Sequence, residues 1–307
     1  MSSTRVIVLT AAVAVLFTAT PSLYAYRLLQ TSATGRTTIT TPFSEVSCND
    51  SGGFTHWSVA NTNWYHNIAN QGSGKDAALY NAMNVWTFVP SASHSLTYKG
   101  RTSAGFATDG LNVASWGTGQ GCSTGCLALT ALVLNSGQVI IESDVTFNNA
   151  YIWSTNGTNY DTWSVAAHEF GHTLGIAHTD AGTAPTMYAF FTSGTTGPRS
   201  LETDDKSALQ CSQTRYPPTT SCIPDGGVTD SSSNCCSGYA FGSYTNSDGT
   251  FQICASVPPG GCAGGGGVDD TLYTTNCCSG AAVSGSTRCL NPADYNNGWA
   301  TCIHTCL

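Results

Sequence analysis

The residues best suited to chemistry stand close together between positions 168 and 178, where the chain reads HEFGHTLGIAH. Residues four apart share one face of a helix, so His168 and His172 can both point at one metal ion. Gly175 can adopt the positive φ that ends a helix and turns the chain, which allows His178 to return as a third ligand. Three imidazoles with one open coordination position are typical of catalytic zinc, because structural zinc has protein ligands at all four positions.

Glu169 lies beside the first of these ligands and is the candidate general base. Zinc held by three neutral imidazoles lowers the pKa of a bound water to about 7. Glu169 is placed to take a proton as that water attacks a peptide carbonyl and to deliver it to the leaving amine. The alternatives are a carboxylate that only supports the metal ligands and a charge on the helix surface, but the position of Glu169 inside the motif argues against both. Chance would produce the five fixed positions in roughly five such chains per million, so we predict a metal site.

The first 25 residues have the pattern of a secretory signal peptide. Arg5 precedes an apolar or small-residue stretch from Val6 to Phe17, and Pro21 follows. The stretch is short for a bilayer span, so we predict cleavage after Ala25 and secretion, with an uncleaved membrane anchor as the alternative. No other segment is apolar enough for stable membrane insertion. The net charge of −8 and the lack of a basic patch argue against a nucleic-acid partner.

The cysteines divide the chain into two parts. Of the 14 cysteines, ten lie between Cys222 and Cys306, and an exported chain is expected to form disulfides. Gly-Gly-Val followed by Asn-Cys-Cys-Ser-Gly occurs at 226–238 and again at 266–280. We therefore predict four parts along the chain: a signal peptide at 1–25, an N-terminal spacer at 26–44, a catalytic domain at 45–217 and a Cys-rich two-repeat region at 218–307.

The Cys-rich region has few large apolar residues, so disulfides must supply most of its constraint. Its aromatic residues could bind a polymer or a cell-surface ligand, or they could only fill two small disulfide-stapled cores. These residues are Tyr239, Phe241, Tyr244, Tyr273, Tyr295 and Trp299.

The region before residue 217 combines helices and strands, so the predicted fold class is α+β. Apolar residues have helical spacing from Asp76 to Trp86. Leu127 to Leu134 and Gln138 to Phe147 are predicted as two strands of a hairpin. Asp161 is a suitable N-cap for the helix that bears the histidine motif. A last helix begins near Thr203, with acidic residues in its first turn, and runs through Leu209.

Met187 follows His178 by nine residues and extends the motif. The residues HEFGHTLGIAH with a following methionine turn resemble the metzincin metalloproteases, in which the methionine lies beneath the histidines. Further segments make the chain similar to the matrixins, the branch that includes the matrix metalloproteases. These segments are 109–116, 142–148, 178–180, 187–188 and 199–205, so the likeness spans residues 75–216.

This resemblance implies a metzincin-type catalytic domain: a twisted mixed sheet with an edge strand for the substrate, an active-site helix and a C-terminal helix. The substrate would lie along the edge strand near Leu127 to Leu134. Gly175 and Met187 would support the site. The pocket for the side chain after the scissile bond would be walled by Ala189, Phe190 and Phe191. The resemblance also leaves Ca2+ as a further ion, whose ligands the sequence does not identify.

The chain departs from the matrixins in two respects. It lacks the propeptide cysteine motif by which many matrixins are kept latent. No second zinc set is recognisable among the remaining histidines, which are His56, His66, His94 and His304. Two disulfides are predicted before the Cys-rich region: a local one between Cys122 and Cys126, and one between Cys48 and Cys211 that would join the ends of the domain.

These observations predict a secreted, extracellular zinc endopeptidase acting on proteins or peptides, with His168, His172 and His178 as ligands and Glu169 as general base. Another metzincin branch with a different substrate preference is a related alternative. The rival interpretation is an adhesive or glycan-binding protein whose repeats bind the ligand and whose protease domain is vestigial. The intact motif argues against the rival, because a decayed site has no reason to keep its base.

Overall fold

The computed structural model describes residues 26–218 apart from 39–42, 70, 73, 91, 119–121, 123 and 124, together with short pieces between 222 and 305. The predicted signal peptide at 1–25 lies outside the described residues, as do the side chains of the six aromatic residues singled out in the Cys-rich region. In the part of the chain that is described, no helix combines the length and the apolar character that crossing a membrane requires.

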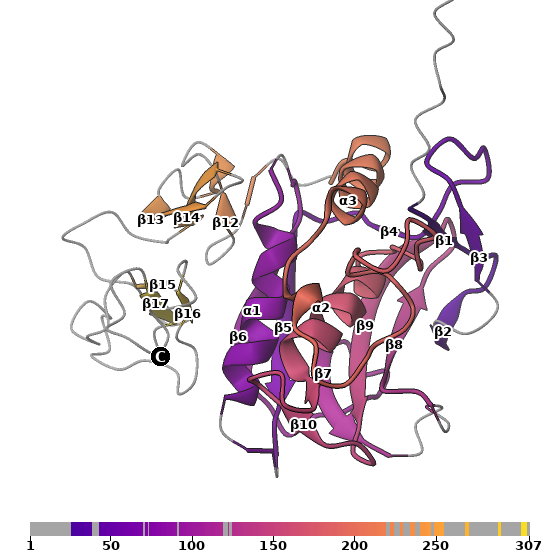
Figure 1. The fold of residues 1–307 in the computed structure, drawn as a ribbon. Coiled ribbons are helices and arrows are strands. Elements are labelled where there is room, and N and C mark those ends of the chain that lie inside the picture. Colours follow the sequence, from indigo (N-terminus) through magenta and orange to yellow (C-terminus); the bar gives the residue numbers. More distant parts are fainter. Residues whose placement is uncertain are drawn as a thin grey trace, which may run out of the picture.

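A mixed β-sheet forms the main body of the protein (Figure 1). Its strand order is β2-β8-β9-β7-β5-β6, and β4 pairs with β9 outside that path. Only the pairings made by β8 are antiparallel. The strands are β2 (Gly35–Thr38), β4 (His56–Trp57), β5 (Asn61–Asn67), β6 (Ser95–Arg101), β7 (Asn112–Gly117), β8 (Ala128–Leu134) and β9 (Val139–Asn148).

The hairpin predicted in this region is confirmed as β8 and β9, but β8 is an open edge strand over only part of its length. Its residues from Ala131 to Leu134 pair antiparallel with β2. The expectation of a free edge from Leu127 to Leu134 is therefore wrong for the second half. The short polar segment that forms β2 has no alternating apolar pattern, so its pairing is decided by tertiary contacts.

Two helices cover the same face of the sheet: α1 (Lys75–Thr87) and α2 (Thr162–Thr173) (Figure 1). They are joined where the Trp86 indole nitrogen donates to the Ala167 carbonyl at 2.7 Å. Leu79 and Phe170 are fully buried between these helices and the sheet. The predicted helix near Thr203 is α3 (Thr203–Arg215), which continues beyond the predicted end. The smaller elements are β10 (Trp153–Ser154), β11 (Tyr160–Asp161) and the 3-10 helix η1 (Gly197–Arg199).

The N-terminal segment predicted as a spacer contributes two strands to this fold. One is β2, and the other is β1 (Leu28–Gln30), which pairs with β3 (Ser44–Val46). Leu28 is completely buried. The segment is therefore packed against the core, because burying its leucines removes apolar surface from water. Both predicted disulfides, Cys48–Cys211 and Cys122–Cys126, are present.

The Cys-rich region is described only in pieces. Its described residues include the disulfides Cys222–Cys236 and Cys235–Cys254. Phe251 packs against Phe88 at the end of α1, with ring centroids 5.2 Å apart. The strands are β12 (Val228–Thr229), β13 (Ala240–Asn246), β14 (Gly249–Cys254), β15 (Val268–Asp269), β16 (Arg288–Cys289) and β17 (Cys302–Thr305).

His94 makes folding sensitive to acid. Its ring nitrogens lie 2.7 Å from the Val59 carbonyl and 3.1 Å from the Thr62 hydroxyl, and burial lowers its pKa from 6.5 to about 4. Between these values only the unfolded chain takes up the proton. The free energy of unfolding should therefore fall by about 1.4 kcal/mol per pH unit as the pH drops from 6.5 toward 4.

The check is urea unfolding of the wild type and His94→Asn at several pH values in this range. We expect the variant to be less stable at neutral pH but to lose stability less steeply on acidification. If the free energy of unfolding fell with pH equally in the two proteins, the acid sensitivity would not come from His94.

Candidate active site

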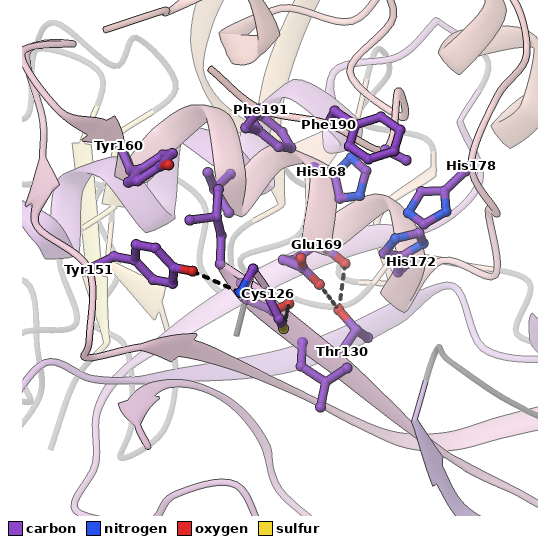
Figure 2. A pocket seen from close by; sticks show the side chains of 16 residues that line it. Cys126, Thr130, Tyr151, Tyr160, His168, Glu169, His172, His178, Phe190 and Phe191 are labelled. Atoms are coloured by element: carbon purple, nitrogen blue, oxygen red, sulfur yellow. Dashed lines mark hydrogen bonds between the residues drawn. The ribbon is translucent and has the colours of Figure 1, made fainter. Parts of the chain in front are cut away.

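The three motif histidines converge on one point (Figure 2). His168 and His172 project from α2, and His178 returns from the chain that follows it. One ligand atom from each lies within 4.8 Å of the others. Among the described residues, this is the one group of three or more potential metal ligands arranged in this way.

Local structure at both ends of α2 explains this convergence. Asp161 caps the helix by accepting from the Ser164 backbone N–H at 2.9 Å, as predicted. Gly175 has a φ of +84°, and a Cβ there would lie 2.2 Å from the Thr55 carbonyl oxygen. Only glycine fits this left-handed turn without strain, so the turn that returns His178 depends on it.

Backbone carbonyls orient two of the imidazoles. The Nδ1 atoms of His168 and His172 lie 2.8 Å from the carbonyl oxygens of Thr186 and Ile176, respectively. A carbonyl only accepts hydrogen bonds, so each Nδ1 carries the proton and each Nε2 is left to bind a metal. Burial lowers the pKa of His168 to about 3, and burial with charge repulsion from the neighbouring histidines lowers the pKa of His172. These neutral donors fit zinc.

Met187 is buried and packs against α2, the helix that carries His168 and His172. A Cβ built on Gly171 would meet the Met187 sulfur at 2.2 Å and Trp86 at 2.7 Å. The methionine turn is held by Asp205, which is 1% exposed and accepts from the backbone N–H groups of Thr186, Met187 and Glu202 at 2.9–3.0 Å. From the sequence, Asp205 was expected only as one of the acidic residues in the first turn of the last helix, and its hydrogen bonds to the methionine turn were not predicted.

Glu169 lies beside the three histidines and is 6% exposed. Its Oε2 accepts a 2.6 Å hydrogen bond from the Thr130 hydroxyl on β8 (Figure 2). Burial raises the pKa of Glu169 to about 7, although the Thr130 hydrogen bond opposes this shift. The carboxyl can therefore gain or lose a proton near neutral pH. The sequence offered no signal for Thr130, which is brought to the site by the sheet.

A cavity of about 310 Å³ contains Glu169 and the three histidines. Its lining includes residues 125–127, which lead into β8, and the first three residues of β8, Ala128 to Thr130. The predicted wall residues Ala189, Phe190 and Phe191 all line it, and Phe190 is 76% exposed. Five further lining residues were not predicted from the sequence: Gly125, Cys126, Tyr151, Tyr160 and Val165.

The other described histidines lie outside this cluster. His56 stacks on Tyr216 with ring centroids 3.7 Å apart. His66 pairs with Asp76 at 2.8 Å, and His94 is hydrogen-bonded in the core. The side chain of His304 lies outside the described part of the chain. Calcium receives no support, because the histidine cluster is the only group of three or more potential metal ligands found among the described residues.

The matrixin family matches residues 115–212. This segment contains the cavity strand β8, the helix α2, the methionine turn and most of α3. The match implies zinc and supports the interpretation of the histidine cluster as its site.

Curated relatives agree with this matrixin match. The chain is similar to interstitial collagenase of Equus caballus, with 41% identity over 71 residues that cover 23% of this chain and 14% of the relative. Neutrophil collagenase of Homo sapiens is 39% identical over 71 residues, covering 23% and 15%. Stromelysin-3 of Rattus norvegicus is 42% identical over 69 residues, covering 22% and 13%. The chain thus spans about a seventh of their length, and these likenesses support a matrixin-like metalloendopeptidase.

Proposed function

We propose that this protein is a secreted zinc-dependent endopeptidase that hydrolyses peptide bonds of extracellular proteins. The observation that carries the proposal is the convergence of three histidines on one point beside a buried carboxyl, with two of the imidazoles oriented by backbone carbonyls. The matrixin match over the same residues supports it.

The chain's own groups account for the proton transfers. When bound by His168, His172 and His178, zinc would polarise the peptide carbonyl and activate a water. Glu169 accepts the proton of the attacking water and returns it to the leaving amine. Because Thr130 donates to Oε2, the other oxygen of Glu169 is left for the water. A peptide paired with the open part of β8 would present its carbonyl to these groups.

Metal removal tests the proposal directly. We expect the purified protein to hold one zinc and to cleave casein or gelatin, to lose this activity with a chelator, and to regain it when zinc is returned. The His178→Ala variant should lose zinc, since only two ligands remain. A protein that binds no zinc and cleaves neither substrate, while its isolated 218–307 segment binds a polymer, would favour the adhesive interpretation.

Export by cleavage after Ala25 would make Tyr26 the first residue. Its backbone nitrogen lies 3.0 Å from Asp204 Oδ1. As a free ammonium group it would form a charge-assisted hydrogen bond, which is stronger than that of an amide. In the protein that begins at Tyr26, we expect Asp204→Asn to lower the free energy of unfolding by about 1–2 kcal/mol. In a form that keeps residues before Tyr26, the same substitution should lower it by less.

Intact mass of the secreted protein, together with urea unfolding of both forms, checks this prediction. Asp180→Asn is the control, since its carboxylate is 77% exposed beside Arg27. A different N-terminus, or equal destabilisation of the two forms, would refute it.

A further inference from the structure

Strand β2 covers half of the β8 edge that leads into the cavity (Figure 1). The pairing runs from Gly35 opposite Leu134 to Thr38 opposite Ala131. The next residue of β8, Thr130, already lines the cavity and contacts Glu169. The covered part of the edge therefore ends immediately beside the candidate catalytic groups.

Arg36 fixes β2 in this position. Its guanidinium lies 2.9 Å from Asp144 Oδ2 and 3.4 Å from Glu142 Oε1, both on β9. It also lies over the Phe106 ring, 4.4 Å from the centroid. Asp144 is completely buried and Glu142 is 4% exposed. Releasing β2 would take a cation away from two buried carboxylates, which is costly, so β2 is a fixed part of the sheet.

The direction of β2 determines what it blocks. A peptide that pairs antiparallel with the open part of β8 runs in the same direction as β2. Its N-terminal end therefore points at Thr38, while its C-terminal end runs toward Gly125. The backbone groups of an edge strand can pair with only one neighbour on that side. Substrate residues far before the scissile bond therefore cannot pair with β8, because β2 already occupies that part of its edge. Substrate residues after the bond can pair with it.

We propose that β2 is a built-in stop that limits how many substrate residues can pair with β8 before the scissile bond. Fewer substrate residues can then pair with β8 before the scissile bond than would pair with an open strand. This inference rests on the proposed peptidase function and adds the specificity-determining element of that site.

Two series of fluorogenic peptides test the stop. Both series share one core sequence that spans a bond cleaved in gelatin. One series is lengthened one residue at a time at the N-terminal end, and the other at the C-terminal end. We expect kcat/KM to rise roughly twofold to tenfold for each added residue that pairs after the bond. N-terminal lengthening should have no such effect once the peptide reaches β2. A continued rise in kcat/KM on N-terminal lengthening would overturn the proposal.

Variants that loosen β2 should remove the limit. Arg36→Ala removes its side-chain contacts, and Thr37→Pro removes a backbone donor within the strand. In both we expect N-terminal lengthening to raise kcat/KM. Arg101→Ala is the matched control. Arg101 also pairs with a buried carboxylate, that of Asp76, but Arg101 lies on β6, at the opposite end of the sheet from β2. An unchanged length dependence in folded β2 variants would count against the stop.

Hydrogen exchange of the wild type provides a readout that does not depend on variants or on activity. The amides of residues 131–134 should be protected without peptide and unchanged by it, while residues 128–130 gain protection when a peptide binds. Peptide-induced protection across the whole of 128–134 would refute the stop. If the zinc-loaded protein cleaves neither series, the peptidase proposal fails; if it responds equally to both extensions, only the stop fails.

Discussion

Glu169→Gln should reduce kcat/KM by roughly 10²- to 10⁴-fold, the range expected when a general acid–base group is lost. The amide has nearly the shape of the carboxyl, so it can keep the hydrogen bond from Thr130, but it cannot accept and return a proton. The three histidines are unchanged, and zinc content should remain at one ion per chain. Steady-state peptide hydrolysis and metal analysis of the same preparation measure both quantities.

Glu202→Gln is the matched control for this substitution. Glu202 is exposed at the start of α3, away from the cavity lining. We expect the peptidase activity of the Glu202→Gln variant to stay near the wild-type level. If Glu169→Gln kept wild-type activity with zinc bound, the assigned general base would be wrong.

Asp205→Ala should have the largest effect on stability. Asp205 accepts from three backbone N–H groups that join the methionine turn to α3. Removing the carboxylate leaves these three N–H groups without their acceptor. The N–H groups of Thr186 and Met187 are buried, and each unsatisfied buried donor costs about 1–3 kcal/mol. We therefore expect the free energy of unfolding to fall by about 2–6 kcal/mol. Zinc affinity should fall as well, because the Thr186 carbonyl of the same turn orients His168.

Urea unfolding and zinc titration measure these two losses. Asp205→Asn should lose less stability and less zinc affinity than Asp205→Ala, because it keeps one carbonyl oxygen as an acceptor. Asp109→Ala, at an exposed loop position, should change neither quantity appreciably. A stable Asp205→Ala protein with wild-type zinc affinity would show that the turn does not depend on this carboxylate.

Much of the site could be predicted because its information is local. The spacing of His168 and His172 fixes their common helix face, and Gly175 allows the turn that brings back His178. Asp161 was recognisable as an N-cap from its place before the helix. Each of these features is decided within a few residues by backbone geometry, so the sequence displays it directly.

The remaining features depend on residues far apart in the chain. Thr130 meets Glu169 across 39 positions, and Asp205 meets the Thr186 backbone across 19. Tyr151 and Tyr160 reach the cavity by packing that their own neighbours in sequence do not indicate.

By itself, the sequence identified the candidate metal ligands, the candidate base, the helix that carries most of them and the matrixin-like pattern around them. Only the tertiary structure decided which groups orient those ligands and that β2 covers half of the substrate edge. The physical reason is that helix faces, caps and turns depend on short-range geometry. Strand partners and buried hydrogen bonds depend instead on how distant segments pack together.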